Sequence, residues 1–398
     1  EVTPIPTPSN VTTPSYTLNS SEGGEVVFAG VCTNALTEVT EGDNTVTFDA
    51  LDDGTYSDCT VTVTDEAGNV SETLQITAFT IDTIVPEVTL SSTITAPTNQ
   101  SPITVDVAVT AAVTGLIADD FTLENATAQA LTGSGNAYVL TVVPVADGPV
   151  RVSLPDGVAQ TAAGNQTVAS NALDFDYDGS APLLTEVTPV PTPGMNPTPT
   201  YTFNSNEAGD ITFAGTCTSD TVAAIVGDNQ ITFASLADGT YDDCALTVTD
   251  AVGNVSETLA VPSFTIDTEQ AATTLTSAIT EPTNTNPIEF DVTFTKPVTG
   301  LEASDFVLVN ATVEAVTGSD DTYRVTIIPT ADGTVEVSLP DSAAADAAGN
   351  GALASNLIAI EYDGTAPVLA VTTAIPSLGA LAAPSLSFSP TEAGDVTY

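Results

Sequence analysis

The segment Leu51–Leu74 reads LDDGTYSDCTVTVTDEAGNVSETL, and Leu236–Leu259 reads LADGTYDDCALTVTDAVGNVSETL. In each copy, apolar residues alternate with threonine, which is the period of a half-buried β-strand. Asp-Gly before this run and Gly-Asn after it are turn signals, because Gly reaches positive φ and Asp and Asn bond their own backbone. The segment therefore predicts a strand that ends in a hairpin loop.

The two copies belong to a long internal repeat. Cys32 and Cys217 are 185 positions apart, and so are Cys59 and Cys244. The same offset relates NEAGDITF at 206–213 to TEAGDVTY at 391–398, where we expect a third copy to begin. Each period holds a shorter, cysteine-bearing half, called type A, and a longer half, called type B. We expect modules at 1–83 (type A), 84–180 (type B), 181–268 (type A) and 269–365 (type B), followed by the start of a further, incomplete type A module at 366–398.

Both halves predict an all-β fold. Short runs rich in Val, Thr, Ile, Phe and Tyr are separated by turn signals about every 8 to 12 residues, and no 3.6-residue period is sustained. This pattern is typical of a β-sandwich of about seven strands. In the first type A module we expect one strand at Thr55–Asp65 and another at Glu72–Asp82. Tyr56 and Tyr241 resemble the tyrosine corner of such sandwiches, in which the hydroxyl bonds back to the main chain; an ordinary strand Tyr is the alternative.

The four cysteines form two pairs with equal separation, Cys32 with Cys59 and Cys217 with Cys244. Even, regularly spaced pairs predict two disulfides, and hence an oxidising compartment outside the cytoplasm. Four unpaired buried thiols are the alternative.

Charge and composition exclude several classes of function. The 398 residues include 52 Asp and Glu against 3 Lys and Arg, and the formal net charge of −49 would repel the phosphates of nucleic acids and anionic membranes. There is no His, the commonest general base, and no cleft signature, so we expect no catalytic residues and no enzyme. No apolar run reaches the roughly 20 residues of a spanning helix, and we expect no membrane insertion by this segment.

Longer motifs resemble a known family. The type B motifs SPITVDVAVTAAVTGLIADDFTLENATAQALTGSG and ADGTVEVSLPDSAAADAAGNGALASNLIAIEYDGTAP, and the type A motifs NEAGDITFAGTC, DGTYDDCALTVTDAVGNVSETL and FTIDT, are similar to bacterial immunoglobulin-like (BIg-type) tandem repeats of large extracellular adhesins and surface proteins. The resemblance covers almost the whole chain. It implies tandem immunoglobulin-like β-sandwiches in an elongated array, which act as extender modules and are often stiffened by calcium at their joints.

An Asp stands near each expected module boundary, at positions 82, 178, 267 and 363. In an immunoglobulin-like sandwich, the loop that carries the DxxGN motif lies at the end where the chain enters, so it should face the linker from the preceding module. At the second type A module this brings together the candidate metal ligands Asp178, Glu207, Asp250 and Asn254, whose oxygens suit calcium. The alternative is a hairpin loop that binds no metal, because Asp, Asn and Gly build such a loop by themselves.

The other copies of this loop differ in their side chains. The same interpretation gives the candidate ligands Glu22, Asp65 and Asn69 in the first type A module, and Asp267, Asp346 and Asn350 at the second type B module. In the first type B module, Thr161 replaces the Asp and the expected neighbouring loop offers Ala111, so we expect no tight site. At the second type B module, Lys296 is placed to occupy the space of a cation and to pair with Asp267, which argues against a metal there.

The leading hypothesis from the sequence is a non-enzymatic extender region of a large bacterial surface adhesin, located outside the cell. Its expected partners are the neighbouring modules of the same chain, and calcium is its hypothetical cofactor. The alternative is the repeat subunit of a self-assembling extracellular fibre, sheath or surface layer, in which like chains would also be partners.

Overall fold

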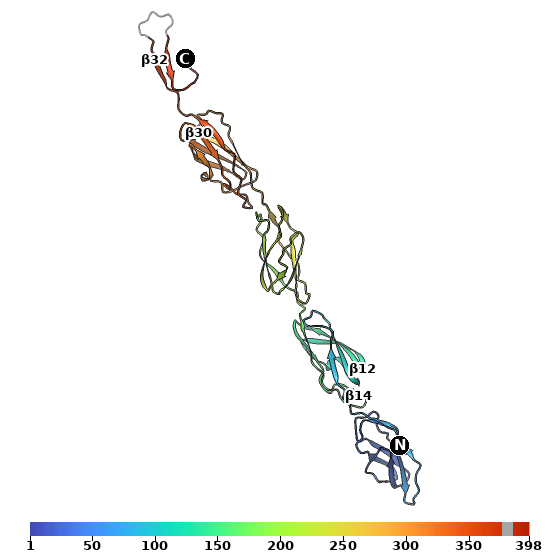
Figure 1. The fold of residues 1–398 in the computed structure, drawn as a ribbon. Coiled ribbons are helices and arrows are strands. Elements are labelled where there is room, and N and C mark those ends of the chain that lie inside the picture. The colour runs from blue at the N-terminus through green and yellow to red at the C-terminus, as the bar shows by residue number, and fades with distance from the viewer. Residues whose placement is uncertain (376–384, 398) are drawn as a thin grey trace. The chain divides into compact units, whose positions relative to one another are not determined.

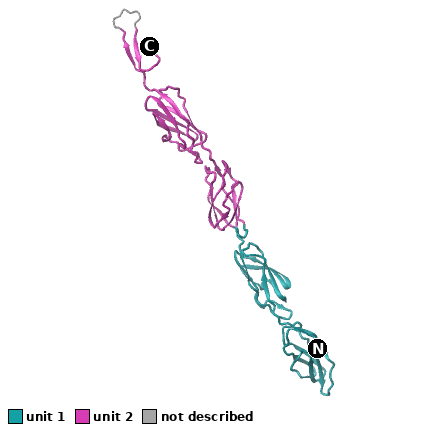
Figure 2. Ribbon diagram, in the orientation of Figure 1, with its two compact units in different colours: residues 1–181, 250–254 teal, residues 182–249, 255–398 magenta. Residues whose placement is uncertain are grey.

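The computed structural model describes residues 1–375 and 385–397. In this range the fold is all-β, as the sequence predicted, and the helical elements are two 3-10 turns, η1 (Ala118–Asp120) and η2 (Ala303–Asp305) (Figure 1). None of the helices in these residues is long and apolar enough to cross a membrane. The chain divides into two compact units, Glu1–Ala181 with Asp250–Asn254 and Pro182–Thr249 with Val255–Tyr398 (Figure 2).

In the first unit, the type A module is built of short antiparallel strands. β2 and β6 form the centre of one sheet in the order β3-β2-β6-β7, while β1 pairs with β4 and β5 pairs with β8. The bounds are β1 (Ser15–Ser20), β2 (Gly24–Ala29), β3 (Glu38–Val39), β4 (Gly42–Thr47), β5 (Gly54–Tyr56), β6 (Thr60–Asp65), β7 (Leu74–Gln75) and β8 (Phe79–Ile81).

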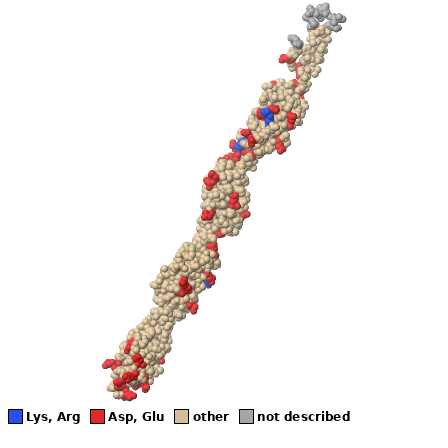
Figure 3. All heavy atoms as spheres, turned by 180° about the vertical axis from the view of Figure 1, so that it is seen from behind, with Lys and Arg blue, Asp and Glu red and all other residues tan. Residues whose placement is uncertain are grey.

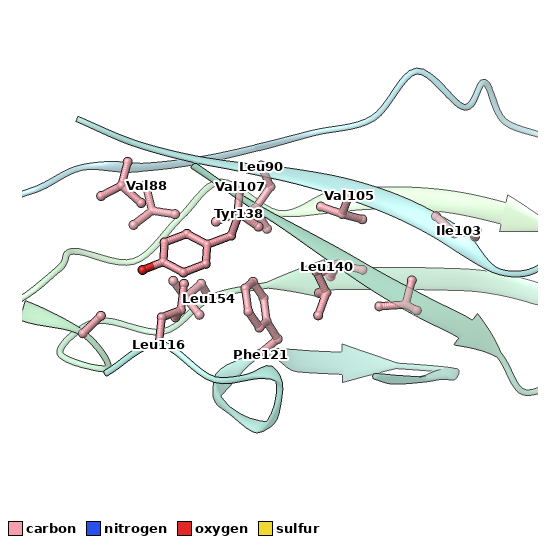
Figure 4. Packing of buried hydrophobic residues seen from close by; sticks show 14 of the residues in the cluster. Val88, Leu90, Ile103, Val105, Val107, Leu116, Phe121, Tyr138, Leu140 and Leu154 are labelled. Carbon is pink, nitrogen blue, oxygen red and sulfur yellow. The ribbon is translucent and has the colours of Figure 1, made fainter. Parts of the chain in front are cut away.

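The type B module of the same unit has longer strands. One sheet has the order β12-β10-β14 with β9 also on β10, and the other has the order β11-β13-β15. Phe121, Tyr138 and Leu140 point into the space between the two sheets (Figure 4). The bounds are β9 (Val88–Ser91), β10 (Ile103–Thr114), β11 (Thr122–Glu124), β12 (Ala126–Pro144), β13 (Gly148–Ser153), β14 (Gln160–Thr161) and β15 (Leu173–Tyr177).

The second unit repeats both arrangements. Its type A module has β16 (Leu184–Thr188), β17 (Thr200–Ser205), β18 (Gly209–Ala214), β19 (Ala223–Ala224), β20 (Gly227–Thr232), β21 (Gly239–Tyr241), β22 (Ala245–Thr249), β23 (Leu259–Ala260) and β24 (Phe264–Ile266). Its type B module has β25 (Thr273–Thr276), β26 (Ile288–Phe294), β27 (Val307–Val309), β28 (Ala311–Ser319), β29 (Thr322–Pro329), β30 (Gly333–Ser338) and β31 (Ile358–Tyr362). Beyond them, β32 (Leu369–Thr373) pairs with β33 (Ser387–Pro390).

Within the described residues, four separate hydrophobic cores follow from the alternation of apolar residues along these strands. β26 has the burial pattern of a strand with one face inward, since every second residue from Ile288 to Phe294 is buried. The cores lie within 5–81, 88–175, 190–266 and 271–360, one inside each expected module. The exact module boundaries stay a prediction.

The type A modules carry the two expected disulfides. Cys32 is bonded to Cys59 and Cys217 to Cys244, and all four residues are almost fully buried. Each bridge closes a loop between the end of one strand and the start of its antiparallel neighbour, such as β2 and β6. The bridge therefore ties two central strands of one sheet.

The tyrosine corner also forms in both type A modules. The hydroxyl of Tyr56 donates to the carbonyl of Asp52 at 2.7 Å, and that of Tyr241 donates to the carbonyl of Ala237 at 2.8 Å. The strands around it were predicted wrongly. The expected strands at 55–65 and 72–82 are each broken in two, because β5 pairs with β8 while β6 pairs with β2 and β7.

Candidate metal site and linker contacts

The DxxGN loop of the second type A module is held by its own Asp. Oδ1 of Asp250 accepts hydrogen bonds from the main-chain N–H groups of Val252, Gly253 and Asn254 at 2.8 to 2.9 Å. Gly253 has φ +99°, a value that other residues rarely adopt. Burial alone would raise the pKa of Asp250, but the hydrogen bonds from Asn254 and its neighbours hold it below the ordinary value. The carboxylate is therefore ionised and fixed in orientation.

A bond from the loop Asn to the linker recurs in three modules. In each case the side-chain Nδ2 donates to the main-chain carbonyl of the Asp in the preceding linker, and we call this the Asn–carbonyl bond. The pairs are Asn165 with Asp82 at 2.7 Å, Asn254 with Asp178 at 3.0 Å and Asn350 with Asp267 at 2.7 Å. These hydrogen bonds agree with the expectation that the DxxGN loop faces the preceding linker.

Both the nitrogen and the oxygen of the Asn254 side-chain amide form hydrogen bonds in this contact. Nδ2 also donates to Oδ2 of Asp250 at 2.8 Å, and Oδ1 accepts from Nδ2 of Asn99 at 3.2 Å. The side chain therefore joins the linker of the first type B module, a loop of that module and its own loop. Its role as a calcium ligand stays a prediction.

The carboxylates of Asp178 and Asp250, which belong to the same compact unit, place oxygens within 4.8 Å of each other, and both residues are partly buried. Burial and the negative charge of Asp250 raise the pKa of Asp178. Like charges this close repel unless a cation neutralises them, and carboxylate oxygens are what calcium prefers. The two carboxylates fit a divalent metal, and the role of Glu207 as a further ligand stays a prediction.

The corresponding corner of the first type A module is more open. Oδ1 of Asp65 accepts from the N–H groups of Ala67 and Asn69 at 2.8 Å, and Oδ2 accepts from Nδ2 of Asn69 at 2.7 Å. The bonds from Asn69 lower the pKa of Asp65. Glu22 lies beside Asp65 in an open acidic hollow. Asp65 and Asn69 thus build the hairpin loop, and their role as metal ligands stays a prediction.

At the second type B module, Lys296 occupies the centre of the contact. Its Nζ lies 2.6 Å from Oδ1 of Asp267, 2.6 Å from the carbonyl of Glu269 and 3.8 Å from Oδ2 of Asp346. The hydrogen bond between them raises the pKa of Lys296 and lowers that of Asp267. Asn350 completes the contact through its bonds to Asp267 and to Oδ2 of Asp346.

The first type B module has the Asn–carbonyl bond but lacks the charged side chains that surround it in the second type B module. Thr161 takes the place of the Asp, and its Oγ1 accepts from the main-chain N–H of Asn165 at 3.2 Å. Asn165 still donates to the carbonyl of Asp82. Ala111, however, lies within β10 and not in a loop, so the expected position of that loop was wrong. The strand β10 continues to Thr114, and its register against β12 shifts between Ala108 and Val113.

Comparison with known proteins gives the family. Two family models, both described as bacterial Ig-like domain, match residues 82–177 and 267–362 in one case and residues 8–83 in the other. This chain belongs to the bacterial Ig-like domain family. Its match segments cover both type B modules and the first type A module, in agreement with the resemblance of the motifs. No curated protein sequence matches it.

Solved structures similar to these bacterial Ig-like modules have low sequence identity. One is invasin, described as a bacterial integrin-binding protein, with 11% identity, a TM-score of 0.31, and coverage of 93% of this chain and 79% of that one. Another is the Bacteroides ovatus mixed-linkage glucan utilization protein SGBP-B, with 12% identity, a TM-score of 0.14 and coverage of 70% of each chain. At these values neither likeness bears on what this chain binds.

Two features of the bacterial Ig-like modules escaped the sequence analysis. Asn254 and Asn350 were considered as metal ligands or turn residues and Asn165 was given no role, whereas the structure shows all three bonding to a linker carbonyl. Asn99, which contacts Asn254, was not considered. The signal that was present is the 185-position offset, which relates Asn165 to Asn350 and Asp82 to Asp267 and so predicts that both pairs share a role.

Proposed function

We propose that this chain is a non-enzymatic extender region of a large extracellular bacterial surface adhesin, whose tandem Ig-like modules project a tip or an anchor from the cell. The observation that carries the proposal is the Asn–carbonyl bond, which recurs with the same atoms in three modules. Such a bond joins a linker to the module that follows and needs no ligand. It supports a role in which modules hold one another in place.

The disulfides and the charge support an extracellular location. Disulfides persist in oxidising compartments, and both type A modules contain one. The acidic residues, red in Figure 3, greatly outnumber the basic ones, which favours solubility and repels nucleic acid. The expected partners are the neighbouring modules of the same chain.

We further propose that calcium stiffens the contact between Asp178 and Asp250. The proximity of these two carboxylates supports a divalent ion, because an ion would remove their mutual repulsion. The bound ion would supply positive charge, and the carboxylate oxygens of Asp178 and Asp250 would be among its ligands. The protein would supply orientation, because Asp250 is fixed by three main-chain N–H groups.

Calcium titration of the whole 398-residue chain tests this second proposal. Calcium at about 1 to 5 mM, at or above the dissociation constants of about 0.1 to 1 mM of extracellular sites, should raise the melting temperature, and Asp178→Asn or Asp250→Asn should remove most of that rise. Asp106→Asn, which removes the same charge from an exposed position on β10, is the control. If calcium changes neither the wild-type melting temperature nor its X-ray scattering, the calcium proposal fails.

The alternative function, a repeat subunit of a self-assembling fibre, sheath or surface layer, has one observation in its favour. β27 is an edge strand, and its Val307 and Val309 are about half exposed. Exposed apolar edge strands pair with other chains. Electron microscopy of native material separates the two functions: an extender gives isolated threads with a distinct tip, whereas a fibre or layer gives ordered lateral repeats.

A further inference from the structure

The ammonium of Lys296 is surrounded by oxygens in the way that a bound cation would be. Asp267 and the carbonyl of Glu269 lie at 2.6 Å, the carboxylate of Glu269 at 3.6 Å and that of Asp346 at 3.8 Å. The side chain of Asp346 is only 4% exposed, whereas that of Lys296 is 22% exposed. A buried carboxylate needs a compensating charge or hydrogen bonds, and Lys296 lies where that charge is needed.

The other type B module supplies a natural comparison within the same chain. An offset of 185 positions relates Lys296 to Ala111, Asp346 to Thr161 and Glu269 to Ile84, while Asp267 corresponds to Asp82. The cation is therefore absent where two of the three carboxylates are absent. The Asn–carbonyl bond is present in both modules, at 2.7 Å. Lys296 therefore occurs in the module that has the additional acidic residues, and the Asn–carbonyl bond forms in both modules with or without it.

The remaining cations of the chain do not lie in such a setting. Arg324 pairs with Glu289 and Asp291, and Arg151 pairs with Asp174, in each case between side chains that are about half exposed. Exposed pairs of this kind contribute little to stability because water screens them. Lys296 differs in having three carboxylates and a main-chain carbonyl around one nitrogen.

We propose that Lys296 takes the place of a metal ion at the contact between Asp267 and Asp346, so that this contact keeps its geometry without calcium. The ammonium offsets part of the negative charge of the linker and loop carboxylates and, through the carbonyl of Glu269, also holds the main chain of the linker. The inference concerns only this contact and does not depend on calcium at Asp178. The contact at Asp267 is then insensitive to the calcium concentration even though acidic side chains surround it.

The test uses the whole chain with Lys296→Met, which keeps the length of the side chain and removes its charge. Isothermal titration calorimetry should detect an additional calcium ion per chain in this variant, with a dissociation constant of about 0.1 to 1 mM. The additional ion should disappear when Asp267→Asn is combined with it. Arg324→Met is the matched control, since it removes the same charge beside exposed carboxylates and should add no site.

Hydrogen exchange of the wild-type chain gives an independent measurement. Chelation of calcium should change the exchange of the Glu269 amide by less than about twofold in the wild type, and should raise it on the order of tenfold in Lys296→Met. Lys296→Met with no additional calcium ion would overturn the proposal. So would a wild-type Glu269 amide that exchanges much faster after chelation, and this second result is decisive even if the variant does not fold.

Discussion

The Asn–carbonyl bond of the second type B module can be tested by Asn350→Ala. The side chain of Asn350 donates to the carbonyl of Asp267 at 2.7 Å and to Oδ2 of Asp346 at 3.1 Å, and the residue is 7% exposed. The substitution removes both bonds and leaves the loop otherwise in place, because Asp346 still accepts from the main-chain N–H groups of Ala348 and of residue 350.

The expected cost follows from the two bonds. A bond to a neutral carbonyl contributes about 1 kcal/mol, and one to a carboxylate about 1.5 to 3 kcal/mol. The second value falls to about 1 kcal/mol here, because the carboxylate of Asp346 keeps its main-chain donors. The contact should therefore open more easily by about 2 kcal/mol, which corresponds to a roughly 30-fold larger open population.

Hydrogen exchange measured by mass spectrometry reports this population at the Glu269 amide, which donates to Oδ1 of Asp267. Asn356→Ala is the matched control, because Asn356 bonds to the main chain of Leu275 within the module. It should speed exchange at Leu275 and leave Glu269 unchanged. If Asn350→Ala leaves the exchange of Glu269 within about threefold of the wild type, the bond does not hold the linker and the reasoning is refuted.

Three further predictions follow from contacts described above. Replacing Cys217 and Cys244 by Ala should destabilise only the second type A module, by about 3.5 kcal/mol, because the bridge closes a loop of 27 positions. Calorimetry should then show the melting temperature of this module falling by on the order of 15 °C. The type B modules, which contain no cysteine, are the internal reference. Tyr241→Phe should cost about 1 kcal/mol, measured by urea unfolding of the same module; no loss would mean that the corner bond is neutral. With calcium chelated, Asp178, whose pKa is raised, should take up a proton first as the pH falls from 7, so its contact gains stability. Asp267, whose pKa is lowered by Lys296, should keep its contact until the pH drops below about 3.8. Amide exchange across this range checks the order, and simultaneous loss of both contacts would contradict it.

Local signals in the sequence were sufficient for the fold class and for the residues that repeat. The alternation in TVTVTD predicts β6, and the equal spacing of Cys32 and Cys59 with their copies predicts the bridges. Both signals depend on residues close in sequence or on an exact repeat. The strand at 55–65 was predicted as continuous because alternation cannot report that β5 and β6 take different partners.

The candidate site was predictable only in part. Carboxylates are visible in a sequence, so the proximity of Asp178 and Asp250 and the pairing of Lys296 with Asp267 could be inferred from loop positions. A main-chain carbonyl has no sequence signature, because every residue carries one. The partner of Asn165 therefore could not be identified until the path of the linker was known.

The acceptor in the Asn–carbonyl bond is a main-chain oxygen, and this has a consequence for how such a chain changes over generations. A duplicated or deleted stretch of gene that preserves the reading frame and the repeat length brings a donor Asn and a linker oxygen back together, whatever side chain the linker residue carries. Recombination between copies can then lengthen or shorten the protein by whole periods without new compensating substitutions where the copies join. The side chains around the bond, such as Thr161 in one copy and Asp346 in another, remain free to diverge.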